Sequence, residues 1–222
     1  MLSTDSGRAA WAARWMEAID RLVYRLASHW LALFNVLVAL FIALPVAAPV
    51  LMAHGAETPA RWIYLAYMPA CHQLPERSYF LFGEKRVYTI QELEARGMAE
   101  GLSLFQRRRF LGNEVVGYKM AFCERDLAIY GAILIAGLAY GLSRRFIRIS
   151  PLPLKIYVLF LVPLGVDGLV QLVGLHESNW WIRTLTGGLF GVGSVWLAYP
   201  RIDAAMRDVT REMRERRHER TR

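Results

Sequence analysis

Four apolar stretches, each close to the length needed to cross a lipid bilayer, constrain this chain more than any other feature. A helix needs about 20 mainly apolar residues to cross roughly 30 Å of hydrocarbon. The stretches cover residues 30–52, 127–142, 154–175 and 180–199. Overall, 55% of the residues are hydrophobic but 21% are charged, which indicates a membrane protein with sizeable aqueous parts. We therefore predict an all-α membrane protein with four transmembrane helices.

Positive residues flank these stretches unevenly and predict their orientation. Short arginine-rich segments precede the first stretch, separate the second from the third, and follow the fourth. Such segments stay in the cytoplasm, whereas the link 176–179 has no Lys or Arg, as expected of an outer loop. The predicted topology is multi-pass with both termini cytoplasmic. The Arg107-Arg108-Arg109 cluster then lies outside, which long loops tolerate.

This topology divides the chain into five segments. They are a basic amphipathic cytoplasmic segment over 1–29, a transmembrane helix over 30–52, an extracytoplasmic cap segment over 53–122, three transmembrane helices within 123–199, and a basic cytoplasmic tail over 200–222. A cleaved signal peptide is the competing interpretation of the first stretch. Its apolar run exceeds the usual 7–15 residues, which favours a retained helix.

Local signals predict further features. Pro45 and Pro49 are expected to bend or end the first helix near its outer side. In the cap segment, Thr89 to Glu92 reads as a capping box with Gly97 as a helix stop, which predicts a short surface helix. Alternation over residues 116–122 indicates an extended stretch or small hairpin, and the short apolar run 61–70 is expected at the membrane interface.

The formal net charge of +8 raises the question of a nucleic-acid partner. Because the arginines gather beside apolar stretches, we predict no nucleic-acid partner. The expected partners are the lipid bilayer and, at the basic termini, anionic lipid. The sequence identifies no protein partner.

Polar residues of separate spans are predicted to meet near the outer face. Asp167 and Gln171 share one helical face, and an Asp inside hydrocarbon costs about 2.5–3.5 kcal/mol and needs a partner. We expect Arg183 to reach them, helped by close helix approach at small residues. Those small residues are Gly137, Gly141, Gly187, Gly188 and Gly191. The candidate binding residues are Asp167, Gln171, Arg183, Arg125 and Tyr130. The alternative is a buried polar clamp that only fixes helix register.

Cys71 and Cys123 leave three interpretations open. Outside the membrane they are candidates for a disulfide. Together with His72 and Asp126 they supply thiolate, imidazole and carboxylate ligands suited to zinc. A catalytic thiol activated by His72 is the third interpretation. Two cysteines are too few for a four-cysteine zinc site.

The chain resembles an uncharacterised family of prokaryotic membrane proteins, domain of unknown function 2085. The resemblance rests on an ordered set of residues between about 69 and 193. They are Cys71 to Ser78 with Phe80 and Gly83, then Gly117-Tyr118-Lys119, Cys123-Glu124-Arg125-Asp126, Ile129-Tyr130-Gly131, Pro163, Asp167-Gly168, Gln171, Ser178, Asn179, Arg183 and Thr186-Gly187. Some members resemble a Cys-x-Arg-Cys form where this chain has Asp126, and a carboxylate can replace a thiolate on zinc.

What the resemblance implies is a fold, a set of site residues and a prokaryotic cytoplasmic (inner) membrane, but no reaction. We therefore predict a binding or transport-related membrane protein with a site at the outer face. One alternative is an intramembrane enzyme, either a metal-dependent hydrolase or a thiol oxidoreductase. The other is an accessory subunit of a membrane complex with no chemistry of its own.

Overall fold

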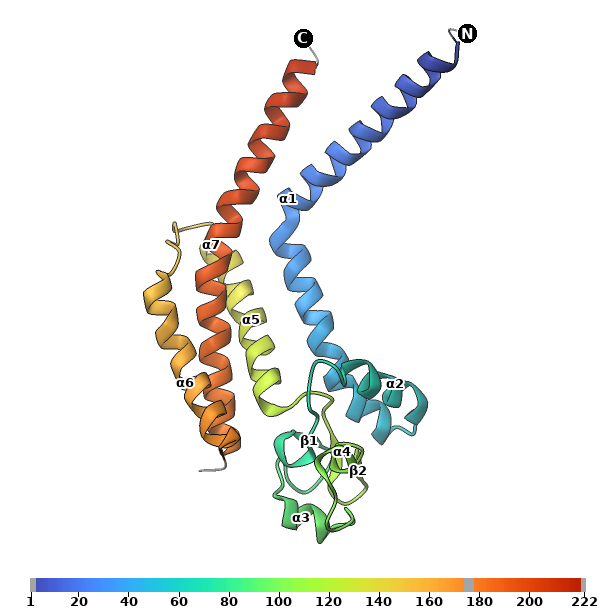
Figure 1. The fold of residues 1–222 in the computed structure, drawn as a ribbon, viewed down its shortest axis with the longest axis vertical. Helices are drawn as coiled ribbons and strands as arrows, with labels where there is room; N and C mark the ends of the chain where they lie inside the picture. The colour runs from blue at the N-terminus through green and yellow to red at the C-terminus, as the bar shows by residue number, and fades with distance from the viewer. Residues whose placement is uncertain (1–2, 174–177, 221–222) are drawn as a thin grey trace.

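Four long helices dominate the computed structural model, which describes residues 3–173 and 178–220 (Figure 1). They are α1 (Ser3–Ala53), α5 (Glu124–Ser143), α6 (Leu154–Leu172) and α7 (Trp180–Arg220). Helices α5 and α6 both pack against α7, and α1 contacts α5 and α7. The N-terminal part of α1 and the C-terminal part of α7 extend beyond the others and diverge (Figure 1).

Within the described residues, three helices are long and apolar enough to cross a membrane. These are Trp11–Ala53, Glu124–Ser143 and Leu154–Gln171. The fourth predicted stretch is the first half of α7, and it is not among them. Its tryptophans, glycines and threonines, together with Arg183, lower its mean hydropathy. Residues 174–177, which hold the predicted end of the third span and the first half of the expected outer link, lie outside the described part of the chain.

The segment between α1 and α5 folds at one end of the bundle (Figure 1). We call residues 54–123 the α1–α5 segment. Its elements are α2 (Glu57–Tyr67), a 3-10 helix η1 (Pro75–Arg77), β1 (Phe80–Leu81), α3 (Ile90–Glu94), α4 (Leu104–Arg107), β2 (Gly112–Asn113) and β3 (Gly117–Lys119). The strands form one antiparallel sheet in the order β1-β3-β2. The described chain is mainly helical, as the all-α prediction requires, and this small sheet is a departure from it.

Two local predictions in this segment are confirmed. Helix α3 begins at the Thr89 capping box, where the Thr89 hydroxyl accepts from Glu92 N at 3.2 Å and the Glu92 carboxylate accepts from Thr89 N at 2.9 Å. The predicted hairpin is the β2 and β3 pair. Only glycine fits at Gly117, because its φ is +73° and an added Cβ would lie 2.1 Å from Leu81 O.

Pro45 and Pro49 do not end α1, which continues to Ala53, so that alternative is wrong. A proline has no N–H, so it leaves the carbonyl four residues earlier without its helical donor. The Tyr67 hydroxyl donates to Phe41 O at 2.8 Å, and Ala121 N donates to Pro45 O at 3.1 Å. The α1–α5 segment therefore supplies the two donors that the prolines of α1 remove.

In α7, too, a neighbouring segment supplies the hydrogen-bond donor that a proline removes. Pro200 lies inside this helix and leaves Trp196 O without its donor. Leu152 N, in the connection between α5 and α6, donates to Trp196 O at 3.2 Å. A proline-freed carbonyl thus anchors a neighbouring segment here as well.

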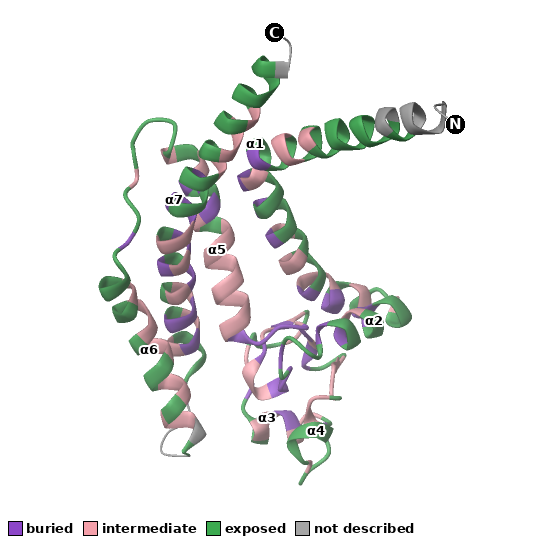
Figure 2. Cartoon of the chain, turned by 45° about the horizontal axis from the view of Figure 1, so that its top comes forward, coloured by how far each residue is buried: buried purple, intermediate pink, exposed green. Residues whose placement is uncertain are grey.

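Glycines set the close approach of α7 to α5. A Cβ on Gly187 would lie 2.8 Å from Arg125 O, and one on Gly191 would lie 2.5 Å from Ile129 O. The predicted small-residue packing is confirmed there, but Gly188 has no such neighbour within 4 Å. Figure 2 shows buried residues along α7 and where α1 meets the α1–α5 segment, while much of α6 is exposed.

We predict that Tyr67→Phe destabilises the protein by about 1–3 kcal/mol, because it leaves the Phe41 carbonyl without a donor in an apolar region. Thermal unfolding of the purified protein in detergent measures this. Tyr118→Phe is the matched control, since Tyr118 packs against the same apolar cluster and its hydroxyl has no hydrogen bond among the described residues. Equal melting temperatures for the two variants would contradict the anchoring role.

Candidate functional site

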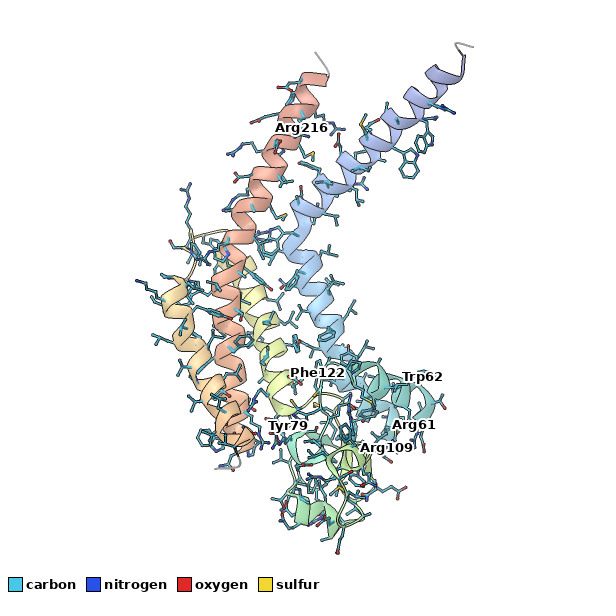
Figure 3. The ribbon with its side chains drawn as sticks, viewed as in Figure 1. Arg61, Trp62, Tyr79, Arg109, Phe122 and Arg216 are labelled. Carbon is cyan, nitrogen blue, oxygen red and sulfur yellow. The ribbon has the colours of Figure 1, made fainter. Side chains whose placement is uncertain are left out.

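The two cysteines come together where the α1–α5 segment meets α5. Cys71 follows α2, where its N–H donates to Tyr67 O at 3.0 Å, and Cys123 is the N-cap residue of α5. Both are free thiols, and both are buried in one apolar cluster with Met52 and Phe122. Figure 3 shows Phe122 at this junction.

Asp126 completes a compact group with the two thiols. Cys123 N donates to Cys71 Sγ at 3.1 Å, and Cys123 Sγ donates to Asp126 Oδ2 at 3.1 Å. The potential ligand atoms of Cys71, Cys123 and Asp126 all lie within 4.8 Å of one another. The hydrogen bond with Cys71 and then burial raise the pKa of the Cys123 thiol well above its usual value, so this thiol keeps its proton at neutral pH.

His72, the fourth predicted metal residue, lies outside this group. Its Nδ1 accepts from Leu74 N at 3.2 Å, and part of its side chain is exposed. The protein atoms around the ring, followed by the positive charge of Arg77, lower the pKa of His72 to about 4, so the imidazole is neutral at physiological pH. The structure therefore brings together three of the four predicted metal ligands.

The donor set suits a metal ion of the zinc class. Two thiolates and one carboxylate are ligands that zinc accepts, and three protein ligands leave a fourth position for another group. The predicted disulfide between Cys71 and Cys123 stays a prediction. It requires the two sulfurs to approach to about 2.05 Å.

Two ion pairs tie the first turn of α5 to the other helices. Arg183 of α7 donates to Glu124 Oε2 at 2.9 Å, and both side chains are buried. Arg125 donates to Asp167 of α6. Successive residues of α5 thus pair with charges on two different helices.

This pattern corrects the predicted pairing of Arg183 with Asp167 or Gln171. The close packing at Gly187, one turn after Arg183, places the guanidinium beside Glu124. Asp167 takes Arg125 as its partner, and Gln171 Nε2 donates to Asp167 O of its own helix at 3.0 Å. The expectation that charges of separate spans meet at one end of the bundle agrees with this geometry, although their partners differ.

Tyr130, the remaining candidate binding residue, supports the site through aromatic contacts. Its ring stacks on Phe122 with centroids 5.4 Å apart and meets Phe41 edge-on at 4.9 Å. Another contact joins the α1–α5 segment to α7, where the Tyr79 hydroxyl and Thr184 Oγ1 lie 2.7 Å apart (Figure 3).

Sequence reasoning missed two buried polar residues that hold the Cys71 loop. Lys119 Nζ donates to Gln73 O at 2.6 Å and to Arg108 O at 2.7 Å. Burial lowers the pKa of Lys119 to about 7, and the two N–H groups of a neutral amine are both satisfied by these carbonyls. Gln73 has a φ of +51° and donates to Tyr64 O at 2.8 Å. Lys119 belongs to the ordered set of residues that carries the resemblance, but nothing in its residue type or its neighbours indicates that it is buried.

Glu124 was also missed as a site residue, although a signal was present. It stands between the candidate residues Cys123 and Arg125, at the same depth as Arg183. Counting rise per residue from both helices places Glu124 at a depth that Arg183 can reach. A buried glutamate almost always has a charged partner, and for Glu124 that partner is Arg183.

Comparison with known proteins agrees with the resemblance found in the sequence. The family described as "Predicted membrane protein (DUF2085)" matches residues 113–197, a range that contains Cys123, Asp126, Asp167 and Arg183. An uncharacterized protein of Methanocaldococcus jannaschii is 28% identical over 155 residues, which are 67% of this chain and 77% of that protein. No solved structure matches the chain. The chain is thus similar to uncharacterised predicted membrane proteins, and these relatives give it no activity.

We predict that Arg183→Gln lowers the free energy of unfolding by about 3–5 kcal/mol, because it leaves the Glu124 carboxylate buried without its cation. Unfolding in detergent, followed by circular dichroism, measures the loss. Arg211→Gln is the control, since its ion pair with Asp208 is exposed and contributes about 0–1 kcal/mol. An Arg183→Gln protein as stable as the control would show that the pair does not hold α7 to α5.

Proposed function

We propose that this chain is a four-span protein of the cytoplasmic membrane, with both termini inside and the α1–α5 segment as an extracytoplasmic cap. Helix α7 packs against α5 and α6, which both have the length and composition of spans, so its first half lies at the same depth. Its tryptophans suit an interface, and the arginine-rich segments at the opposite end favour a cytoplasmic location for that end.

We further propose that the junction of the cap with α5 binds one metal ion of the zinc class. The observation that carries this proposal is the convergence of Cys71 Sγ, Cys123 Sγ and an Asp126 oxygen within 4.8 Å. Both cysteines are buried, which favours a bare ion over a larger organic substrate. The ligands come from two segments far apart in the sequence, so binding would also fasten the Cys71 loop to α5.

The two ion pairs position this site. Glu124 and Arg125 lie between the ligands Cys123 and Asp126 and are held by Arg183 and Asp167. Fixing the first turn of α5 in this way fixes the directions of the ligand side chains, which a metal site requires. The two ion pairs therefore serve to hold the side chains of Cys123 and Asp126 in the positions that metal binding needs.

The role we propose for this ion is binding or transport, because among the described residues the group has three ligands and does not form the closed four-ligand shell of a structural zinc site. The rival function is thiol redox chemistry, which the proximity of the same two sulfurs favours. In that case two electrons and two protons leave the thiols as a disulfide forms, and an external acceptor takes them. Metal content and thiol state separate the two functions.

We expect detergent-purified protein to bind one equivalent of Zn²⁺ or Co²⁺, and Cys71→Ser or Cys123→Ser to abolish this binding. Elemental analysis and the Co²⁺–thiolate absorption measure it. Affinity should fall by about tenfold or more per pH unit between roughly pH 8 and pH 6, because the proton on Cys123 must leave before the sulfur can bind metal. The raised pKa of Cys123 sets this direction.

Glu114→Gln is the control for this experiment, because Glu114 is an exposed acid on the turn between β2 and β3. It should bind metal like the unaltered protein, whereas Asp126→Asn should bind more weakly. Two thiols that resist alkylation until a reductant is added, in protein without metal, would replace the proposal with the redox function.

A further inference from the structure

Two cavities lie at the end of the bundle opposite the cysteines, where α5 ends and α7 continues beyond it. Their volumes are about 360 Å³ and about 380 Å³, at the small end of the range for ligand pockets. The first lies between the turn after α5 and the middle of α7, and the second lies between α7 and α1. Arg144, Asp203 and Arg207 line both cavities, so the two share one wall.

Positive charge dominates these cavities. Five arginines line them, against the single carboxylate of Asp203; they are Arg144, Arg145, Arg148, Arg207 and Arg214. Asp203 is only 4% exposed. Its oxygens accept from Arg144 at 2.5 Å, Arg207 at 2.6 Å and Trp30 Nε1 at 3.2 Å. One buried carboxylate therefore holds two guanidiniums in place and leaves the rest of the positive charge unbalanced.

Two arginines have no acidic partner to compensate them. Arg145 and Arg148 are exposed, one on each cavity, and neither forms an ion pair within residues 3–173 and 178–220. Arg214 is held by the Tyr24 hydroxyl at 3.0 Å, which is not an anion. Arginine guanidiniums suit phosphate oxygens, because their planar fork of N–H donors can form two parallel hydrogen bonds with them.

Apolar side chains stand beside these arginines. Phe146 is 79% exposed and Ile147 is 60% exposed, and both lie between Arg145 and Arg148 in the turn after α5. Trp30 and Trp196 lie at the same end and donate from their indole nitrogens to Asp203 and to Ser150 O. Exposed apolar groups and tryptophans at the end of apolar helices mark headgroup depth.

We propose that these cavities bind the phosphate of an anionic phospholipid headgroup. Arg144 and Arg207, fixed by Asp203, form the floor of the site, and Arg145 and Arg148 contact the phosphate oxygens. Phe146 and Ile147 contact the upper acyl chain, which favours a lipid over a soluble phosphate. This site is separate from the proposed metal site and lies at the other end of the bundle (Figure 1).

The test compares binding of phosphatidylglycerol with phosphatidylcholine to the full-length protein in neutral detergent, by native mass spectrometry. The double variant Arg145→Gln, Arg148→Gln removes two charges that form no ion pair among the described residues. Its melting temperature should therefore not change. We expect its affinity for phosphatidylglycerol to fall about fivefold for each arginine, hence about 25-fold, with no change for phosphatidylcholine.

The matched control is Arg61→Gln, Arg109→Gln, which removes the same charge from exposed side chains of the α1–α5 segment at the opposite end of the bundle, where Figure 3 shows both residues. It should change the affinity by less than about twofold, because screening weakens charges that far from the site. Equal losses in the two double variants would overturn the cavity site. Displacement of the lipid by inorganic phosphate or by glycerol 3-phosphate would overturn the lipid and assign the cavities to a soluble phosphate.

Discussion

Backbone carbonyls that proline leaves without a donor must find another one inside an apolar helix, and this requirement shapes the whole structure. Phe41 O and Pro45 O of α1 accept from Tyr67 and Ala121 of the α1–α5 segment, and Trp196 O of α7 accepts from Leu152. An unsatisfied carbonyl in hydrocarbon costs several kcal/mol, so Pro45, Pro49 and Pro200 each create a strong anchoring point for a neighbouring segment. The anchors at Tyr67 and Ala121 lie close in sequence to Cys71 and Cys123. They therefore fix the spacing of the two thiols.

The same intolerance of unpaired polarity explains the charges. Glu124, Arg125, Asp167 and Arg183 lie on three helices and form two ion pairs around the first turn of α5. That turn also supplies Cys123 and Asp126, so the packing of the spans and the geometry of the proposed metal site depend on one short piece of chain. At the other end, Asp203 plays the corresponding part and orders two arginines beside an unbalanced positive cavity. Each end of the bundle is thus organised by a buried carboxylate.

Local signals predicted much of the fold. Hydropathy gave three of the spans, the Thr89 and Glu92 capping box gave α3, and alternation gave the hairpin of β2 and β3. The helix ends and the ion-pair partners were harder to predict from the sequence, because they depend on contacts between distant segments. Pro49 looks like a helix stop until Ala121 is known to reach Pro45 O, and Arg183 reaches Glu124 only because Gly187 seats α7 closely on α5. The burial of Lys119 has no sequence signature, since its partners are backbone carbonyls.

In the proposed topology the α1–α5 segment caps the outer face while both termini stay inside, which places thiols, carboxylate and ion pairs together on one side of the bilayer. Epitope accessibility tests this most directly, with one tag inserted after Gly101, an exposed glycine of the α1–α5 segment, and another at the C-terminus. We expect antibody to label the Gly101 tag on intact spheroplasts and the C-terminal tag only after the membrane is permeabilised. Labelling of the Gly101 tag only after permeabilisation would contradict the proposed topology.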